Sequence, residues 1–144
     1  MPEISKDELE RRKKYMRRYR RNAALVKRLE LRVQAKQDQI TKVKTSNYSA
    51  MPRGGQPVEL SDLISDRDEL EARVKRLKAK GRVLRQEIAE KIDELDDPRQ
   101  ADVLEYYCLD CMTIEEIGEV MGYTARHVYE LYSKAFTFIS INNQ

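Results

Sequence analysis

The sequence has few of the residues on which large cores, membrane spans and disulfide frameworks depend. Its 144 residues include no Trp, five Gly and four Pro, and aromatic residues make up 7%. So little Gly and Pro argues against an all-β fold or a long disordered chain. No apolar run approaches membrane-spanning length, and the N-terminal residues lack the apolar stretch of a signal peptide. We therefore expect a soluble cytoplasmic protein that does not bind membranes.

The two cysteines, Cys108 and Cys111, form a single C-x-x-C motif. Because His127 is the only histidine, Cys and His from one chain cannot supply the four ligands of a structural zinc site. A redox motif would stand between a strand and a helix, whereas this pair ends an expected helix. Cys108 is therefore interpreted as a small buried hydrophobic residue, and we expect no metal and no cofactor.

Catalytic motifs are missing as well. The adjacent Gly54 and Gly55 lie in an expected loop and do not form a phosphate-binding motif. No Ser, Cys or paired-carboxylate arrangement comes with a plausible pocket. We therefore expect that the protein is not an enzyme and has no small-molecule substrate.

The most informative segment is residues 113–135, TIEEIGEVMGYTARHVYELYSKA, which fits the frame of a helix-turn-helix. Gly118 is the small residue where two helices cross, Gly122 suits a left-handed turn, and Thr124 suits the N-cap of the second helix. Apolar residues occupy the positions that hold the helices together: Ile117, Met121, Tyr123, Val128 and Leu131. The pattern predicts that residues 124–135 enter a major groove. An ordinary helical hairpin with a Gly turn is the plainer alternative.

The expected recognition helix carries side chains that suit DNA. The guanidinium of Arg126 can form two hydrogen bonds to a guanine edge, and Thr124 at the helix N-terminus suits a phosphate or a thymine methyl group. Glu130 can accept from a cytosine amine or simply be solvated, and His127 can equally be an ordinary surface residue. The predicted base-reading residues are Thr124, Arg126, His127, Tyr129, Glu130 and Ser133.

Two long helices are expected before this segment, over residues 5–44 and 59–95, joined by a loop at about 45–58 that contains Met-Pro, Gly-Gly and Gln-Pro. The second helix has leucines at seven-residue intervals: Leu63, Leu70, Leu77 and Leu84. Nearly equal lengths predict an antiparallel coiled-coil hairpin in which paired residue numbers total about 103. A basic-zipper dimer is the rival, but its basic segment would run straight into the leucine repeat. The sequence thus predicts an all-α protein, with a hairpin domain at residues 1–96 and a helix-turn-helix domain at residues 97–144.

Charge is distributed unevenly, although the formal net charge is only +3. Residues 1–44 hold fifteen Lys and Arg against six Asp and Glu, whereas residues 97–144 hold three against eight. The expected DNA reader is therefore acidic, although phosphate neutralisation supplies most non-specific affinity. The basic run at the open end of the hairpin resolves this, and its predicted phosphate-binding residues are Arg11, Arg12, Lys14, Arg17, Arg18, Arg20 and Arg21. Alternatively, the run pairs with acidic residues near the end of the second helix.

Residues 103–131, VLEYYCLDCMTIEEIGEVMGYTARHVYEL, resemble the promoter-reading C-terminal domain of bacterial sigma factors. With the loop YSAMPRGG at residues 48–55, the layout resembles late-gene transcriptional activators of the RinA/ArpU type, from phages of Gram-positive bacteria. Cys111 departs from the sigma pattern, which usually has Gly there. The resemblance implies a sequence-specific binder of double-stranded DNA that acts on transcription with RNA polymerase, in the cytoplasm of a bacterial host.

Two other functions fit the same layout. Small terminase subunits, which recognise DNA for packaging, also join a helix-turn-helix to coiled-coil helices. A sigma mimic that binds polymerase without reading DNA would explain the acidic C-terminal part. A homo-oligomer stays open in each case, because two helices alone bury little apolar surface.

Overall fold

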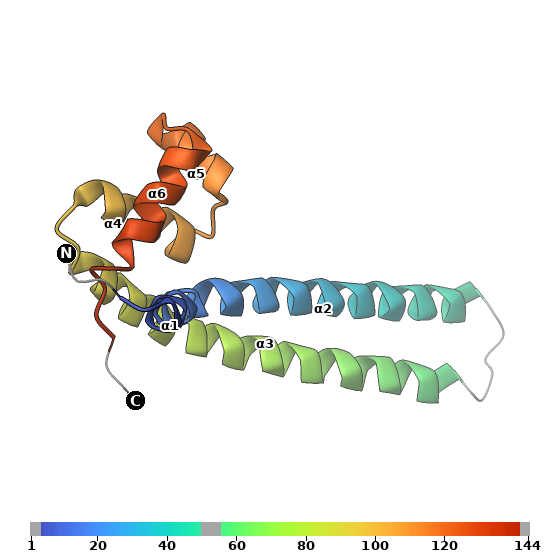
Figure 1. The fold of residues 1–144 in the computed structure, drawn as a ribbon. Helices are drawn as coiled ribbons and strands as arrows, with labels where there is room; N and C mark the ends of the chain where they lie inside the picture. Colours follow the sequence, from blue (N-terminus) through green and yellow to red (C-terminus); the bar gives the residue numbers. More distant parts are fainter. Residues whose placement is uncertain (1–3, 50–55, 142–144) are drawn as a thin grey trace. The chain divides into compact units, whose positions relative to one another are not determined.

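The computed structural model describes residues 4–49 and 56–141, and the side chains of residues 4–46 and 59–141. Every regular element within these ranges is helical, which confirms the all-α fold class (Figure 1). The elements are α1 Lys6–Met16, α2 Arg18–Ser49, α3 Gln56–Asp93, α4 Pro98–Leu104, the π-helix η1 Glu105–Leu109, α5 Ile114–Met121 and α6 Ala125–Ala135. None of these described helices combines the length and the apolarity that a bilayer crossing requires.

The chain packs into two compact units. The terminal unit comprises Met1–Asn22 and Gly81–Gln144, and the hairpin unit comprises Ala23–Lys80. Helices α2 and α3 contribute residues to both. This grouping by packing differs from the predicted domains, residues 1–96 and 97–144. Those domains stay a prediction of which parts fold independently.

The hairpin unit is a pair of long helices that pack along an apolar seam (Figure 1). Its buried and half-buried seam residues are Leu25, Val26, Leu29, Val33, Leu70, Val74 and Leu77. Across the seam, Lys36 lies 3.5 Å from Asp66, and Arg67 donates to Gln37 at 2.8 Å. These pairs fit the predicted antiparallel register, so the expected packing of the two long helices is confirmed.

The long helices extend farther into the predicted loop than expected. Helix α2 continues to Ser49 and α3 begins at Gln56, so part of the predicted loop at 45–58 is helical. The remaining loop residues, 50–55, lie outside the described residues. Pro57 does not prevent the early start of α3, because Pro is tolerated in the first turn of a helix.

The predicted single helix over residues 5–44 is wrong in one respect, because the structure breaks it at Arg17. Helix α1 ends at Met16, Arg17 has φ −86° and ψ 0°, and α2 begins at Arg18. The N–H of Arg17 still bonds to the carbonyl of Lys13 at 3.0 Å. Met16 is fully buried in the terminal unit, and this packing explains a turn that no Gly or Pro marks.

The terminal unit has one apolar core that draws on α1, the end of α3 and the C-terminal helices. Its buried members are Met16, Ile88, Ile92, Val103, Leu104, Cys108, Leu109, Ile117, Val128, Leu131, Tyr132, Ala135, Phe136 and Ile139. Cys108 is fully buried, as expected, and this burial raises the pKa of its thiol to about 12. The Cys108 thiol therefore stays protonated at neutral pH.

Gly81 lies in the interior of α3, close to side chains of α2. A Cβ atom at Gly81 would lie 2.9 Å from Nδ2 of Asn22 and 3.7 Å from the ring of Tyr19. Asn22 is 8% exposed. The predicted register places Gly81 opposite Asn22, and this contact confirms that pairing.

Cys111 follows η1 in a left-handed backbone conformation, with φ 58°. The N–H of Met112 then bonds to the carbonyl of Tyr106 at 3.0 Å, which closes the helix end. Glycine usually fills such a position, because a Cβ atom in the left-handed region costs about 1–2 kcal/mol. The departure from the sigma pattern therefore falls on a strained residue.

Replacing Cys111 by Gly is expected to raise the free energy of unfolding by about 1 kcal/mol, since relief of this strain exceeds the added chain entropy of Gly. Urea unfolding followed by circular dichroism measures the change. Cys111→Ala keeps the Cβ atom and should leave stability within about 0.5 kcal/mol of the parent. An equal gain from both variants would show that the thiol, and not the backbone, is unfavourable.

Candidate nucleic-acid interface

The turn between α5 and α6 is fixed by residues at both helix ends. Thr113 and Glu116 form a reciprocal capping box at the start of α5, and the bond from the Thr113 N–H holds the pKa of the Glu116 carboxyl below its usual value. Gly122 ends α5 in the left-handed conformation, with φ 74° and ψ 32°. Thr124 caps α6, and its hydroxyl accepts from the N–H of His127 at 3.1 Å. The start of each helix is thus fixed by a local bond between a side chain and the backbone, and the end of α5 by the left-handed glycine.

Gly118 is the point of closest approach between α5 and the chain entering α6. A Cβ atom there would lie 2.7 Å from the carbonyl oxygen of Tyr123, closer than real Cβ contacts allow. Ile117, Val128 and Leu131 are buried beneath this crossing. Only glycine fits at position 118 without moving the backbone.

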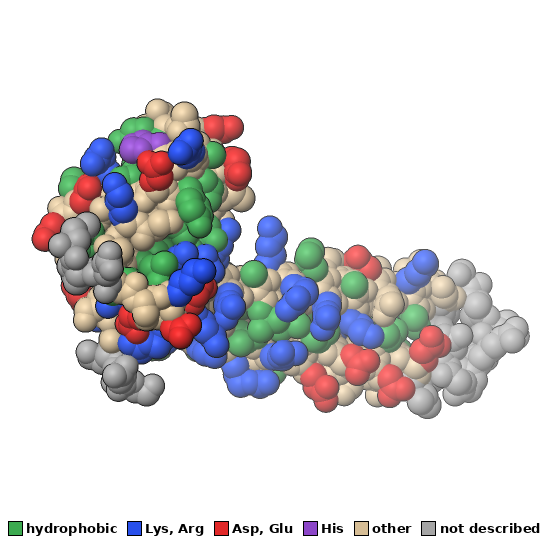
Figure 2. Space-filling model, in the orientation of Figure 1, with side chains coloured by type: hydrophobic (Ala, Val, Ile, Leu, Met, Phe, Trp, Pro, Cys, Tyr) green, Lys and Arg blue, Asp and Glu red, His purple; other side chains and the backbone are tan. Residues whose placement is uncertain are grey.

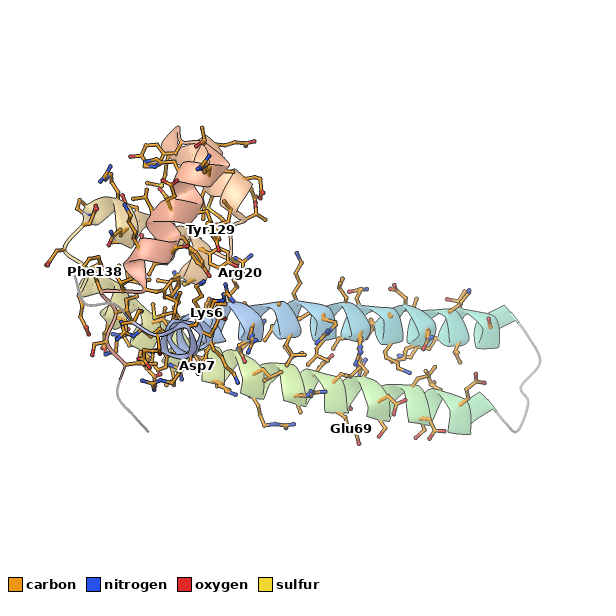
Figure 3. The ribbon with its side chains drawn as sticks, viewed as in Figure 1. Lys6, Asp7, Arg20, Glu69, Tyr129 and Phe138 are labelled. Atoms are coloured by element: carbon orange, nitrogen blue, oxygen red, sulfur yellow. The ribbon has the colours of Figure 1, made fainter. Side chains whose placement is uncertain are left out.

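Helix α6 has one buried face and one exposed face. The side chain of Arg126 is 91% exposed and lies 3.5 Å from the carboxylate of Glu130. Tyr129 is 53% exposed and stands on the surface of α6 (Figure 3). Thr124 is exposed, whereas His127 and Ser133 are half-buried. The six predicted base-reading residues therefore all lie on α6 or at its N-cap. The exposed ones are Thr124, Arg126, Tyr129 and Glu130.

The ring of His127 packs edge-on against the ring of Tyr123, with the ring centres 4.6 Å apart. This contact connects the first turn of α6 to the turn before it. It gives His127 a packing role beside the predicted contact to DNA.

Arg12 and Arg17, two of the seven predicted phosphate ligands, bind the end of α6. Arg12 donates to the carbonyls of Phe136 at 2.9 Å and Thr137 at 3.2 Å. Arg17 donates through Nε to the hydroxyl of Tyr132 at 3.0 Å. The last carbonyls of a helix have no partner within the helix, so these contacts hold α1 to the C-terminus of α6.

Arg20 binds the end of η1 in the same manner. Its Nη1 donates to the carbonyls of Tyr107 and Met112, each at 2.9 Å, and its guanidinium lies 4.1 Å from the ring centre of Tyr107. Figure 3 shows Arg20 at the start of α2, on the side that faces these helices. Arg85 of α3 donates to the neighbouring carbonyl of Leu109 at 2.9 Å. Two arginines from the long helices thus bond to the carbonyls of Tyr107 and Leu109 in η1 and of Met112 just after it.

The remaining predicted phosphate ligands differ in their surroundings. Arg18 pairs with Glu87 at 2.6 Å, which is the only ion pair in the described residues between this run and the end of α3. Arg11 pairs with Glu8, and together with Arg12 it lowers the pKa of the Glu8 carboxyl to about 2. Lys14 and Arg21 are exposed and have no hydrogen bond or ion pair to described residues.

Sequence reasoning missed Tyr132 and Arg85. Tyr132 is buried, stacks edge-on against Tyr107 and Phe136, and accepts from Arg17. Its position four residues after Val128 signals the inward face of α6. Arg85 gives no such signal, because its acceptor is a backbone carbonyl far away in the sequence.

Figure 2 shows that basic and acidic side chains alternate over the visible face of the terminal unit, without a single large basic surface. Within residues 4–49 and 56–141, no group of His, Cys, Asp and Glu is arranged to hold a metal ion. Comparisons with protein-family models, with curated proteins and with solved structures find no match to this chain.

Proposed function

We propose that the protein is a sequence-specific DNA-binding regulator of transcription in which α5, its turn and α6 act as a helix-turn-helix. Helix α6 would enter the major groove. The observation that carries this proposal is the crossing at Gly118 and the turn at Gly122, together with the exposed guanidinium of Arg126 at the start of α6. We propose further, from the resemblance of residues 103–131, that the regulator is phage-encoded and activates transcription with RNA polymerase in the bacterial cytoplasm.

In this proposal the basic run has two tasks. Arg12, Arg17 and Arg20 bind carbonyl and hydroxyl groups within the terminal unit and so position α6. Lys14 and Arg21 are left exposed, and they are the cations of the run with the most freedom to contact phosphates. Positioning and phosphate contact would thus fall to different members of one charge cluster.

Arg126→Ala tests the reading role of α6. We expect it to weaken binding to a site selected from random duplexes by about 1–3 kcal/mol, because a base contact is lost, and to leave binding to scrambled duplexes nearly unchanged. Arg99→Ala is the matched control, since Arg99 is an exposed arginine of the same unit on α4. Fluorescence anisotropy titrations against both duplexes measure the effect. If Arg126→Ala binds the selected site as tightly as the parent, α6 does not read bases there.

A second candidate function is a polymerase-binding protein that does not read DNA. It is favoured by the surface of α5, where Val120 is 57% exposed and where Glu115, Glu116 and Glu119 of the same helix are exposed too. An apolar side chain on an acidic helix suits a basic protein surface better than DNA. Capture of purified bacterial RNA polymerase by the full chain, abolished by Val120→Glu, combined with no salt-sensitive DNA binding, would favour this function.

A further inference from the structure

Two ion pairs show which residues lie on each side of the seam in the hairpin unit. Lys78 lies 2.9 Å from Glu30, and Lys36 lies 3.5 Å from Asp66. The heptad spacing of the seam residues puts these two ion pairs on opposite sides of the seam. Residues on one side of a coiled-coil helix recur at intervals of three, four and seven. Residues at these intervals from either ion pair therefore lie on the same side of the seam as that pair.

Five cations share the side that holds Lys36 and Asp66. On α2, Arg32 and Arg28 lie four and eight residues before Lys36. On α3, Arg73 and Lys80 lie seven and fourteen residues after Asp66, and Arg76 lies between them. We call this set the arginine flank, and its members are Arg28, Arg32, Arg73, Arg76 and Lys80. All five are exposed, and none has a hydrogen bond or ion pair to a described residue.

Few acidic residues of the hairpin lie beside these cations. Glu30 and Glu71 belong to the opposite side, while Glu69 and Asp66 lie nearer the loop. In Figure 2, acidic side chains gather over the part of α3 nearest the loop, and basic side chains over the other part of the hairpin unit. Glu69 lies four residues before Arg73 and Asp66 lies seven before it, so these two carboxylates offset part of the charge at the loop end of the arginine flank. The five cations still outnumber the two anions on this side.

The spacing of these cations suits a polyanion. In the antiparallel register they occupy about nine residue levels along the helix pair, or about 14 Å at 1.5 Å per residue. One strand of duplex DNA places several phosphates within such a length. Four of the five cations are arginines, whose planar fork binds a phosphate through two hydrogen bonds.

We propose that the arginine flank of the hairpin unit binds the phosphodiester backbone of duplex nucleic acid. Among the residues of the hairpin unit whose side chains are described, 23–46 and 59–80, none is aromatic, so this part of the unit offers no stacking surface of the kind that single strands require. It also lacks the row of large apolar side chains by which helices enter a membrane surface. The favoured partner is thus a duplex held by its backbone.

This surface is separate from α6 and reads no bases. It shares a DNA partner with the proposed function, but it acts even if α6 has no sequence preference. The two ideas therefore fail in different measurements: α6 in the comparison of selected with scrambled duplexes, and the arginine flank in the salt dependence of binding to scrambled duplexes.

The test uses the full chain with Arg28, Arg32, Arg73 and Arg76 all replaced by Gln. Binding to a scrambled duplex of about 30 base pairs, three helical turns, is measured over a series of salt concentrations. We expect the slope of log affinity against log salt to fall in magnitude by about 3.6, because each of the four lost phosphate contacts removes about 0.9. A second variant with Lys at the same four positions should keep most of the slope.

The matched control replaces four exposed lysines on the opposite side by Gln: Lys27, Lys44, Lys75 and Lys78. It has the same change in net charge and should keep most of the parent slope. Equal losses in the two Gln variants would overturn the proposal in favour of a general charge effect. An unchanged slope in the arginine variant would overturn it outright. Loss of binding to phosphatidylserine vesicles, with duplex binding retained, would replace the duplex with a membrane.

Discussion

Replacing Arg20 by Met is expected to destabilise the terminal unit by about 3 kcal/mol. Arg20 donates charged hydrogen bonds to the carbonyls of Tyr107 and Met112, and each such bond contributes about 1.5–3 kcal/mol. Met replaces the aliphatic stem of Arg but leaves both carbonyls without this donor. Urea unfolding followed by circular dichroism measures the loss.

The neighbouring Arg21 supplies the control. It carries the same charge on the next residue of α2, is exposed and has no hydrogen bond or ion pair to a described residue. Arg21→Met should therefore change the free energy of unfolding by no more than about 0.5 kcal/mol. Similar effects from the two substitutions would mean that net charge, and not the carbonyl bonds, determines the stability of the unit.

Asparagine at position 118 is expected to destabilise the terminal unit by about 3 kcal/mol, and asparagine at position 122 by less than about 1 kcal/mol. The Cβ atom at 118 would lie 2.7 Å from the backbone oxygen of Tyr123, and such overpacking costs about 1–3 kcal/mol or more. At Gly122 no atom lies within 4 Å, and Asn tolerates the left-handed conformation better than other residues.

Because the introduced side chain is the same, the difference between Gly118→Asn and Gly122→Asn isolates the close approach of the helices. Thermal melts give the stabilities, and titration with a selected duplex gives the binding. Gly118→Asn should lose binding along with folding, whereas Gly122→Asn should keep both. Equal melting temperatures would show that α5 and the chain entering α6 can separate at little cost.

Local backbone signals made parts of this fold predictable. Gly122 and Thr124 take the conformations expected of a helix end and an N-cap, because these preferences depend on a few neighbouring atoms. The hairpin register follows from the leucine spacing, since each slip would expose apolar surface. The capping box of Thr113 and Glu116 also has a sequence signature, Thr followed three residues later by Glu.

Other features depend on contacts between distant residues. The break at Arg17 has no Gly or Pro to mark it, and burial of Met16 explains it. The partners of Arg12 and Arg20 are backbone carbonyls, which carry no sequence signature. Composition cannot distinguish a cation that binds a carbonyl of the same chain from one that is free to bind a phosphate. The assignment of the basic run to DNA thus stays a prediction for all seven residues, of which Lys14 and Arg21 have no hydrogen bond or ion pair to a described residue.

The terminal unit takes residues from both ends of the chain, Met1–Asn22 and Gly81–Gln144. During synthesis its first segment leaves the ribosome long before the segment that completes its core. The hairpin can form in between, and its closure brings Asn22 beside Gly81, which removes most of the loop entropy that the later docking would otherwise cost. The hairpin would then fold before the terminal unit. A nascent chain that stops before α6 would leave Met16 without most of the core residues that bury it.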